Sequence, residues 1–390
     1  MHKCIDICAV VVILRFMTTA TLAASRRPGL WRRLLQPLVS PEVFDFWAGL
    51  VRPGWSWDRP LGRIVARHEA AHEAVTLLIQ PNRHWQGFAP GQHLNVGVQV
   101  DGRWVQRSYS LSGIPRRDGR IAITVRRVEG GVVSEHLTRR ARVGEVLTLG
   151  PAFGEMTWPT RATTERVEQA PWLFLAAGSG ITPLMSLVRA WAEADMPAGL
   201  TLVYWARTRA EFCFADELRE LAMRNGRFRV HFVLTREPQL RDNELQGRLS
   251  EARLASLVPD LAERQVYACG PSGFVDTARR VAGSARAFQA EAFNPPALTT
   301  VAPLTGTVAV HLALSQRTLE VTAGQSLLTA LEAQGLRPAF GCRIGVCRTC
   351  VCPKQNGSTQ DMNTGDMHHG HDSALRLCVS RPASDITLNL

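Results

Sequence analysis

Four cysteines near the C-terminus have the spacing of a metal site. Cys342, Cys347 and Cys350 follow the pattern Cys-x4-Cys-x2-Cys, and Cys378 comes further along the chain. Thiolates with this plant-type spacing hold a [2Fe–2S] cluster. A structural zinc site more often has two Cys-x2-Cys pairs or a mixed set of Cys and His. We therefore predict an iron–sulfur cluster with these four cysteines as its ligands.

A further cysteine, Cys352, is not needed for the cluster, because four thiolates are enough to bind it. We interpret it as a buried or surface thiol, and the alternative is that it serves as a substitute ligand. The segment between Cys350 and Cys378 also carries a group of sulfur and imidazole side chains: Met362, Met367, His368, His369 and His371. Such side chains can bind soft or borderline metals, but a solvated loop is the simpler interpretation.

Two further segments have the character of nucleotide-binding turns. Gly178, Gly180 and Thr182 lie in Gly-Ser-Gly-Ile-Thr-Pro, which follows an apolar strand-like run and precedes helical sequence. Free backbone N–H groups at such a helix start suit a pyrophosphate, although glycine turns also occur there for packing reasons. Cys269, in Cys-Gly-Pro, ends a later strand at the edge where α/β sheets bind ligands, with a core thiol as the alternative.

An Arg-Ser-Tyr-Ser segment lies on a predicted strand, so alternation places Arg107 and Tyr109 on one face. An arginine fork can hold a phosphate while a tyrosine ring lies against a flat heterocycle. An exposed charge beside a packed aromatic ring explains the same letters equally well. Gly131 and Ser134, in Gly-Gly-Val-Val-Ser, offer N–H groups and a hydroxyl to a phosphate, which is a weaker signal.

These motifs lie in a sequence that divides into an N-terminal extension, residues 1–58, and three predicted domains. Residues 59–160 contain short strands separated by turns, which favours an antiparallel β-barrel. In residues 161–296 apolar strands alternate with helices, which predicts a doubly wound α/β sheet. Residues 304–390 combine strands and a helix with the cysteines, and a Pro- and Thr-rich linker precedes them.

The expected elements can be given by residue range. The barrel strands are 74–79, 93–98, 104–110, 121–128 and 145–149. The α/β strands are 172–177, 200–206, 228–234 and 265–268, and the helices between them are 183–194, 214–224, 250–257 and 273–282. The last domain has strands 307–314 and 318–321 and a helix 326–334.

Composition and charge exclude several classes of protein. The 390 residues have a formal net charge of +11, yet the arginines are dispersed and no nucleic-acid-binding motif is present, so we expect no nucleic-acid partner. Anionic cofactors or an anionic surface explain the charge more simply. No apolar stretch reaches the roughly 18 residues of a membrane span. Clustered cysteines indicate a reducing compartment, and we predict a cytoplasmic protein.

The N-terminal extension leaves alternatives open. The apolar run 9–14 is short for a signal peptide, and translation starting at Met17 is at least as good an explanation. Residues 26–57 read as amphipathic helix rich in arginine and tryptophan. We interpret this segment as a lid on the following domain, with peripheral membrane contact or partner docking as the alternative.

The order of the motifs resembles the ferredoxin–NADP reductase superfamily, and in particular its fused reductases of class IB type that feed electrons to oxygenases and desaturases. The resemblance covers residues 59–390. It implies a β-grasp-like ferredoxin domain after the flavin and nucleotide domains. It also implies roles for the motif residues. Arg107, Tyr109 and Ser110 would bind flavin, with Tyr109 against the isoalloxazine and Arg107 at phosphate.

The same resemblance places Gly131 and Ser134 at the flavin phosphates. Gly178, Gly180 and Thr182 match the nicotinamide nucleotide loop, and Cys269 matches the residue beside the flavin edge that accepts hydride. Members that end after the nucleotide domain often close on an aromatic residue covering the flavin. Phe293 is the candidate for that place here.

The implied activity is transfer of hydride from a nicotinamide dinucleotide to flavin, followed by single electrons to the cluster and a partner protein. The partner would be a fatty-acid desaturase, a Rieske oxygenase or a cytochrome P450. Arg207 and Arg209 favour NADPH over NADH, because arginines after the second strand can accept a 2′-phosphate. The resemblance favours FAD over FMN. The alternative function is a redox sensor whose cluster state controls partner binding without turnover.

Overall fold

The computed structural model describes residues 40–51, 54–157, 170–293, 306–343 and 345–390. The chain forms two compact units, residues 1–52 and 53–390. The described part of the first unit is one helix, α3 (Pro41–Val51), and half of the predicted lid or membrane segment, residues 26–57, lies outside the described residues. Among the described helices, none is long and apolar enough to cross a membrane.

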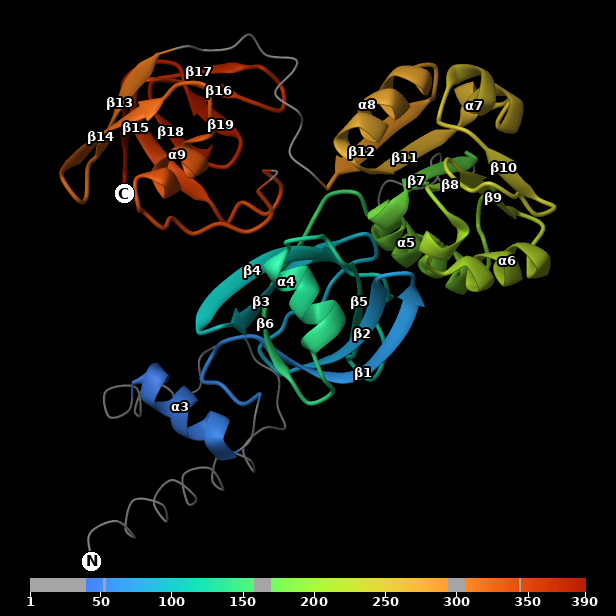
Figure 1. Cartoon of the computed structure of the whole chain (residues 1–390), viewed down its shortest axis with the longest axis horizontal. Helices are drawn as coiled ribbons and strands as arrows, with labels where there is room; N and C mark the ends of the chain where they lie inside the picture. Colours follow the sequence, from blue (N-terminus) through green and yellow to red (C-terminus); the bar gives the residue numbers. More distant parts are fainter. Residues whose placement is uncertain (1–39, 52–53, 158–169, 294–305, 344) are drawn as a thin grey trace, which may run out of the picture. The chain divides into compact units, whose positions relative to one another are not determined.

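The second unit begins with a six-stranded antiparallel sheet (Figure 1). Its strands are β1 (Leu61–Ala71), β2 (Ala74–Pro81), β3 (His93–Val100), β4 (Arg103–Ser110), β5 (Ile121–Arg126) and β6 (Val146–Phe153), in the order β4-β3-β6-β1-β2-β5. A bridge between Leu111 and Ile123 joins the end of β4 to β5, so the sheet closes as a barrel. Alternate residues such as Leu77, Ile79 and Ile121 fill its interior.

The sequence did not predict β1. Bulges after Ile64 and after Glu69 break the alternation of its side chains, which removes the period-two signal that identified the other strands. The Gly-Gly-Val-Val-Ser segment forms a single turn of helix, α4 (Val132–Glu135), continued by the π-helical turn His136–Arg140.

The following domain is a parallel sheet of the order β10-β9-β8-β7-β11-β12. Its strands are β7 (Trp172–Ala177), β8 (Leu200–Ala206), β9 (Phe228–Leu234), β10 (Glu244–Gln246), β11 (Gln265–Gly270) and β12 (Ala287–Ala292). Its helices are α5 (Ile181–Glu193), α6 (Ala215–Arg224), α7 (Glu251–Leu257) and α8 (Ser272–Val281), each within two residues of its predicted start and one of its predicted end. The short strands β10 and β12 were not predicted.

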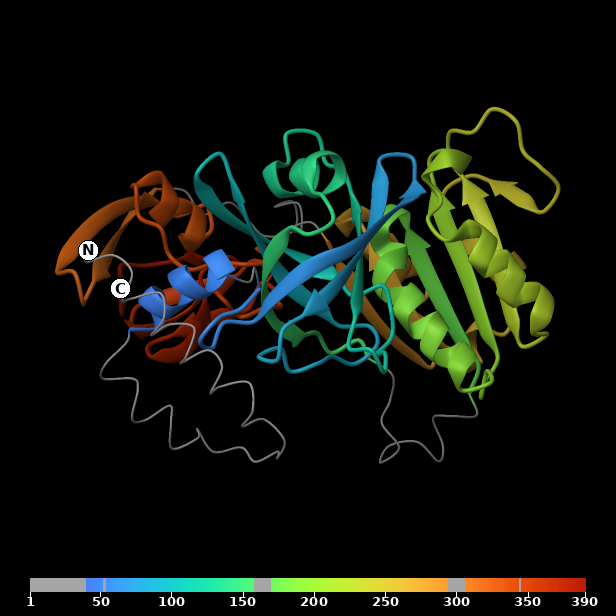
Figure 2. The ribbon, with the colours of Figure 1, turned by 90° about the horizontal axis from the view of Figure 1, so that it is seen from below.

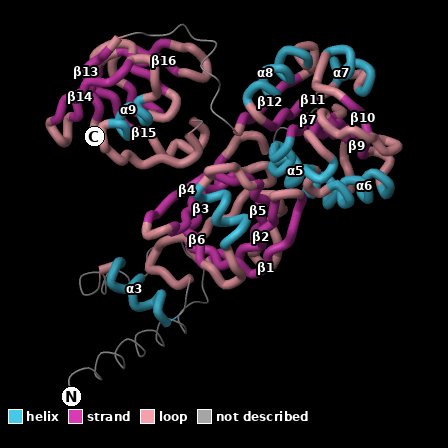
Figure 3. Tube along the Cα trace, viewed as in Figure 1, coloured by secondary structure: helices cyan, strands magenta, loops and turns pink. Residues whose placement is uncertain are grey.

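Helices cover both faces of this sheet (Figures 1 and 3), and Figure 2 views the face that α5 and α6 cover. Phe174 on β7 packs in one core with Leu184 of α5 and Leu218 of α6. Leu175, the next residue on β7, belongs to a second core with Ala278 of α8. Because neighbouring residues of a strand face opposite sides, this is the doubly wound arrangement expected from continuous apolar strands.

The C-terminal domain has a five-stranded sheet in the order β14-β13-β20-β15-β18 and a three-stranded sheet in the order β17-β16-β19. The strands are β13 (Thr307–Leu312), β14 (Arg317–Thr322), β15 (Val351–Asn356), β16 (Ser358–Asp361), β17 (Met367–His369), β18 (Asp372–Arg376), β19 (Ser380–Pro382) and β20 (Ile386–Leu388). Helix α9 (Leu327–Ala333) packs Leu327 and Leu331 into the same core as Val310 of β13. Ser326 caps this helix by accepting a hydrogen bond from the Thr329 N–H, 3.3 Å away.

The predicted multidomain fold class is confirmed: a β-barrel, a doubly wound α/β domain and an α+β ferredoxin-type domain follow each other along the chain. The predicted boundaries near residues 160 and 296 fall in segments outside the described residues and stay predictions. One local prediction is wrong. The Met- and His-containing segment is not simply a loop, because Met367, His368 and His369 form β17, which pairs with β16 and remains exposed.

Candidate functional site

The strand order of the α/β domain determines where a ligand can bind. The chain moves outward from β7 to β8 and β9 and then returns to the other side of β7 with β11. Sheets of this kind bind ligands beyond the carboxyl ends of the strands at such a reversal of order. Gly178 follows β7 directly, and Cys269 is the second-last residue of β11, so both lie at this edge of the sheet.

The glycine loop after β7 needs its glycines for two separate reasons. Gly178 has φ +56°, a conformation that favours glycine. Gly180 lies against β11, and a Cβ atom there would be 2.0 Å from the Cys269 carbonyl oxygen. Thr182 is buried, and its Oγ1 donates a hydrogen bond to the Ser179 carbonyl, 2.9 Å away. Gly178 and Gly180 thus shape the loop, while Thr182 stabilises it from within.

A pocket of about 530 Å³ opens at this edge. Its lining residues from the glycine loop and β8 include Gly178, Ser179, Trp205 and Arg207. The Trp205 ring packs against Phe274, with 5.4 Å between ring centroids, and its indole N–H is buried without a hydrogen-bond partner in the described part of the chain. A pocket with an unsatisfied donor and an aromatic wall fits a polar, flat ligand such as a nucleotide.

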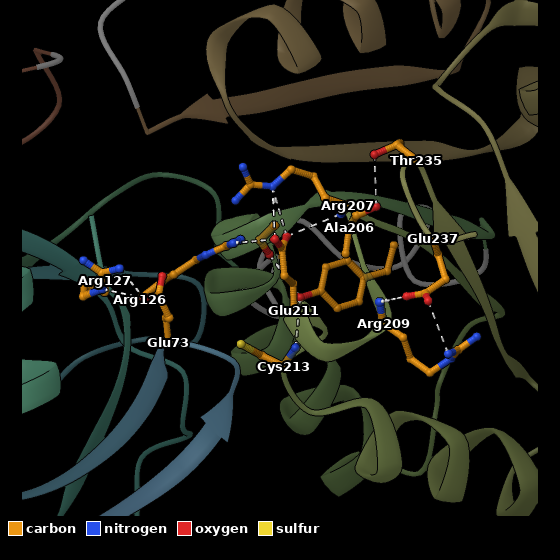
Figure 4. Close-up of polar contacts among 12 residues, drawn as sticks. Glu73, Arg126, Arg127, Ala206, Arg207, Arg209, Glu211, Cys213, Thr235 and Glu237 are labelled. Carbon is orange, nitrogen blue, oxygen red and sulfur yellow. Dashed lines mark hydrogen bonds and ion pairs between the residues drawn. The ribbon is translucent and has the colours of Figure 1, made fainter. Parts of the chain in front are cut away.

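The charges of this pocket centre on Glu211 (Figure 4). Its carboxylate accepts from Arg207 Nε at 3.1 Å and pairs with Arg126 Nη2 at 3.0 Å. Burial of Glu211 opposes its ionisation, but Arg126 and Arg207 outweigh that effect and hold its pKa below the usual value. Arg207 binds through Nε and is 55% exposed, so the guanidinium remains accessible to a ligand.

The structure separates the two arginines that were predicted together. Arg207 lines the pocket, whereas Arg209 does not. Arg209 makes a bidentate contact with Glu244, at 2.7 and 2.6 Å. Its backbone N–H donates to the Glu237 carboxylate at 2.7 Å, a contact that Figure 4 shows. The Glu244 carboxyl is lowered to a pKa of about 2 by the hydrogen bond from Arg209. Arg209 therefore fixes the loop after β8 instead of facing a ligand.

Arg248 also lines the pocket and is exposed, and its side chain makes no hydrogen bond or ion pair with the described part of the chain. Sequence reasoning missed this arginine, together with Trp205 and Arg126. Arg248 precedes α7 and follows the short strand β10, which had no recognisable pattern in the sequence. Its neighbours in the pocket come from distant parts of the chain.

The Arg-Ser-Tyr-Ser segment occupies β4, as predicted. Arg107 is half-buried, and its Nη1 donates to the Gln106 carbonyl at 2.7 Å. Tyr109 packs against the barrel core, and burial raises the pKa of its phenol well above the usual value, so the ring presents a neutral hydroxyl. Ser110 is buried at the end of the strand.

The Gly-Gly-Val-Val-Ser turn is bound internally. The Gly131 N–H donates to the Val128 carbonyl at 2.9 Å, and Ser134 Oγ accepts from the Val128 N–H at 3.2 Å. A Cβ atom at Gly131 would be 2.5 Å from Ser134 Oγ, which explains the glycine. In this structure both candidate phosphate-binding residues, Gly131 and Ser134, make hydrogen bonds within the turn. A bound phosphate would have to replace the hydrogen bond of Ser134.

A hydrogen-bonded chain crosses from the barrel to the α/β domain. His93 on β3 contacts Ser110 Oγ through Nδ1 at 3.0 Å and the Glu291 carboxylate of β12 through Nε2. Phe293 lies edge-to-face on the His93 ring, with centroids 6.3 Å apart. Glu291 lies opposite Cys269 in the register of β11 and β12, so this chain connects Ser110, a predicted flavin-binding residue, with the strand neighbour of Cys269.

Cys269 is completely buried, and its Sγ contacts Met156 Sδ at 3.7 Å. Burial raises the pKa of the thiol well above the usual value. Cys269 is therefore a neutral thiol and has no character of a nucleophile. Its place beside the ligand edge suits a side chain that packs against a flat ligand and excludes water.

The four candidate cluster ligands come together as two pairs. The Cys342 N–H donates to Cys347 Sγ at 3.2 Å, and the Cys347 N–H donates to Cys342 Sγ at 3.3 Å. Cys350 and Cys378 share a hydrogen bond between their thiols. The hydrogen bond from Cys342 lowers the pKa of Cys347 to about 5, and the contact with Cys378 lowers the pKa of Cys350 to about 7, which favours thiolates at Cys347 and Cys350. The same contact raises the pKa of Cys378.

This pairing fits a cluster of two iron atoms, each bound by two protein thiolates. Among the described residues, no three His, Cys, Asp or Glu side chains are grouped around one point as ligands of a single metal ion would be. Cys352 points elsewhere. Its Sγ is 3.6 Å from the carbonyl oxygens of both Pro353 and Asn389, and burial raises its pKa to about 11.

Three family models match successive parts of the chain. They are an oxidoreductase FAD-binding domain over residues 63–158, an oxidoreductase NAD-binding domain over 174–280 and a 2Fe-2S iron-sulfur cluster binding domain over 310–383. An NADPH oxidoreductase of Mycobacterium tuberculosis H37Rv is 32% identical over 376 residues, which cover 94% of each chain. The chain belongs to the ferredoxin reductase family of fused FAD, NAD(P) and [2Fe–2S] oxidoreductases.

Two other members place this reductase in context. The ferredoxin reductase component of 3-ketosteroid-9-alpha-monooxygenase from the same strain is 33% identical over 318 residues, covering 76% of this chain and 84% of that protein. The crystal structure of phthalate dioxygenase reductase covers 85% of this chain and 97% of its own, with a TM-score of 0.55 and 22% identity, so it shows the shared fold. The predicted cofactors FAD, NAD(P)H and [2Fe–2S] are thereby confirmed, as is the prediction of an electron-transfer oxidoreductase.

Proposed function

We propose that this reductase takes hydride from NADPH and delivers single electrons through FAD and its [2Fe–2S] cluster to a partner oxygenase or fatty-acid desaturase. The observation that carries the proposal is the arginine-lined pocket at the carboxyl edge of β7 and β8, on a chain that also holds two cysteine pairs in a separate domain. When bound, FAD accepts two electrons as hydride and releases them singly, which a cluster requires.

In this scheme the residues of the chain bind, orient and exclude water. Tyr109 and Arg107 hold the flavin from β4, while Ser110 is oriented by His93, whose other nitrogen contacts Glu291. Cys269 closes the nucleotide edge as a neutral, buried thiol. The flavin phosphates would lie at Gly131 and Ser134, with rearrangement of the Ser134 contact described above.

We assign the cluster to Cys342, Cys347, Cys350 and Cys378, supported by their two mutual contacts and by the separate environment of Cys352. The nucleotide would lie over Gly178 and Gly180, with Thr182 stabilising the loop from below. The preference for NADPH rests on Arg207, which lines the pocket and is the more exposed of the two predicted arginines, aided by Arg248. The name of the mycobacterial NADPH oxidoreductase supports the same preference.

The partner is proposed from the relatives, because the ferredoxin reductase component of a monooxygenase is 33% identical over 318 residues of this chain. The redox-sensor alternative has no support among the relatives, which carry the names of an oxidoreductase and a reductase component. The contact of the N-terminal segment with a membrane has no support in the described residues.

The test is a comparison of electron acceptors with purified protein. The protein should contain FAD and two iron atoms per FAD, and NADPH should drive rapid reduction of cytochrome c. Metal analysis that finds zinc in place of iron would refute the proposal. It would also be refuted if NADPH drives reduction of ferricyanide but of no one-electron protein acceptor. Turnover of a purified oxygenase or desaturase in the presence of the reductase then identifies the partner.

A further inference from the structure

Asn95 lies on β3 of the flavin barrel and is only 5% exposed, although its side chain is polar. Its Oδ1 accepts a hydrogen bond from Ser108 Oγ of the neighbouring strand β4. Its Nδ2 donates to Thr349 Oγ1 at 3.1 Å. Thr349 lies between Cys347 and Cys350, two of the proposed cluster ligands. A buried amide of the barrel is therefore hydrogen-bonded to the cysteine loop, 254 residues further along the chain.

A glycine allows the cysteine loop to come this close to the amide. A Cβ atom on Gly341 would be 2.8 Å from Asn95 Nδ2 and also 2.8 Å from Cys347 Sγ. Any other residue at this position would push the loop away from the barrel, so glycine is needed for the close approach. The barrel amide and the sulfur of a proposed ligand thus lie next to the same point of the loop.

A second contact joins the same two parts of the chain. Phe340 precedes Cys342 by two residues, and two guanidinium groups lie over its ring. Arg107 of β4 is 5.7 Å from the ring centroid, and Arg343 of the cysteine loop is 4.0 Å from it. Arg343 is held in turn by Glu332 of α9, with 3.0 Å between Nη1 and Oε2. The position of the loop against the barrel therefore does not depend on one hydrogen bond.

The Thr349 hydroxyl connects the barrel amide to a cluster ligand. The pKa of Cys347 is lowered to about 5, first by the hydrogen bond from Cys342 and also by hydrogen bonds from the side chain and the backbone of Thr349. Because an amide NH₂ group can only donate, the Thr349 oxygen accepts from Asn95 and its own hydrogen remains for the sulfur. A directed chain of hydrogen bonds thus runs from β4 to a thiolate: Ser108, Asn95, Thr349 and Cys347.

Hydrogen bonds to sulfur influence how easily an iron–sulfur cluster is reduced. Reduction adds negative charge to the cluster and its thiolates, and a donor at the sulfur stabilises this charge, so the reduction potential rises. A hydroxyl whose oxygen accepts a hydrogen bond is polarised and donates more strongly. Contacts beyond the immediate ligands tune metal sites in this way. The hydrogen bond from Asn95 should therefore strengthen the one that Thr349 donates to Cys347.

We propose that Asn95 is a positioning residue for electron transfer: through Thr349 it strengthens the hydrogen bond to Cys347 and raises the reduction potential of the [2Fe–2S] cluster. The flavin barrel then sets part of the driving force for the passage of electrons from FAD to the cluster. The inference rests on the proposed assignment of Cys347 as a cluster ligand. It goes beyond that assignment, because a residue of one domain adjusts a property of the cofactor of another.

The experiment measures the midpoint potential of the cluster by redox titration followed by EPR, on the full-length, FAD-loaded protein. Thr349→Val removes the hydroxyl and should lower the potential most. Loss of one hydrogen bond changes the reduction equilibrium by up to about tenfold, which is about 59 mV for one electron. Asn95→Leu should lower the potential by less, because the Thr349 hydroxyl remains. Thr349→Ser keeps a hydroxyl and should have the potential of the wild type.

Gln99→Leu is the matched control. Gln99 lies on the same strand and on the same face as Asn95, since the residues between them alternate with Val96 and Val98 of the barrel core. Gln99 is exposed and makes no hydrogen bond or ion pair with the residues that the structure describes. Its replacement should leave the potential unchanged.

The decisive variant combines Asn95→Leu with Thr349→Val. If Asn95 acts through the Thr349 hydroxyl, the double variant should have the potential of Thr349→Val alone, because the second change then has nothing left to remove. Iron per FAD is determined for every variant, so that loss of the cluster is not mistaken for a shift in potential. If Asn95→Leu is too large for the site and loses FAD, Asn95→Ala takes its place in the same comparison.

Two results would overturn the inference. One is an unchanged potential in Asn95→Leu at two iron atoms per FAD. The other is an equal shift by Asn95→Leu with and without the Thr349 hydroxyl, since Asn95 would then act by another route, such as access of water. Failure of the ligand assignment is seen separately, because Cys347→Ser would then retain its iron. If Thr349→Val shifts the potential and Asn95→Leu does not, the assignment stands and the role of Asn95 is wrong.

Discussion

Arg207 and Arg209 are two residues apart and carry the same charge, and we predict opposite consequences for their replacement. Arg207→Gln should change nucleotide selectivity and leave stability nearly unaltered, because an exposed ion pair contributes about 0–1 kcal/mol. Arg209→Gln should lower stability and leave the ratio of NADP⁺ to NAD⁺ affinity unchanged. The reason is that Arg209 contacts Glu244, whose side chain is 3% exposed, and lies outside the pocket.

The size of the stability effect follows from Glu244. Its pKa falls from the usual 4.5 to about 2, and each pKa unit corresponds to about 1.4 kcal/mol. Because Arg209 is 24% exposed and solvent screens the pair, we expect a loss nearer 1–2 kcal/mol than the roughly 3 kcal/mol of the full shift. A depressed carboxyl pKa contributes stability that is complete above the unfolded value of 4.5 and is lost as pH falls toward 2. The wild type and Arg209→Gln should therefore differ most near neutral pH and converge below pH 4.5.

The assay combines urea unfolding of the FAD-loaded protein at pH 7 and at pH 4 with nucleotide titration of both variants. A protein of several domains can unfold in steps, so tryptophan fluorescence of the α/β domain is followed separately from flavin release. Equal stability of Arg209→Gln and wild type, together with a changed NADP⁺ to NAD⁺ ratio, would refute the assignment and restore Arg209 as a ligand of the 2′-phosphate.

Three further outcomes are expected. Cys352→Ser should keep two iron atoms per FAD and should still transfer electrons to cytochrome c. Cys350→Ser should lose iron but still reduce ferricyanide. If only Cys352→Ser loses iron, Cys352 replaces Cys350 in the set of cluster ligands. Gly180→Ala should abolish NADP⁺ binding, since its Cβ would be 2.0 Å from a carbonyl oxygen, while Gly199→Ala, with no atom within 4 Å, should bind normally, as calorimetry can check. His93→Gln should slow flavin reduction by NADPH in anaerobic stopped-flow without changing NADP⁺ affinity, because it releases Ser110 from its orienting contact; an unchanged rate would argue against that role.

Local sequence predicted the residues whose task depends on neighbours along the chain. The cysteine loop carries three of its four thiols within a few residues, and Gly178 needs glycine for its own backbone conformation, with φ +56°. The helices of the α/β domain were found because each packs a periodic apolar face on a continuous apolar strand. Such features can be recognised within short segments of the sequence.

The remaining features depend on which distant residues meet. Nothing near Arg209 in sequence shows that Glu244 occupies its guanidinium, because β10 is a strand of only three residues with no pattern. In the same way the sequence cannot distinguish Arg126, which ends β5, from Arg127, which follows it directly. Only the packing of this strand end beside the Arg209–Glu211 turn places Arg126 in the lining of the pocket.

Charge pairing therefore decides which arginines of this basic protein can act on a ligand. Arg209 has two acidic partners in its own domain, and Arg127 has two in the barrel. Arg126 and Arg207 share a single carboxylate, so together they keep one unbalanced charge at the pocket. A search for ligand-binding arginines in related reductases should accordingly count the carboxylates within reach of each guanidinium, because an arginine with its own acid stabilises a loop and an arginine that shares one remains able to bind phosphate.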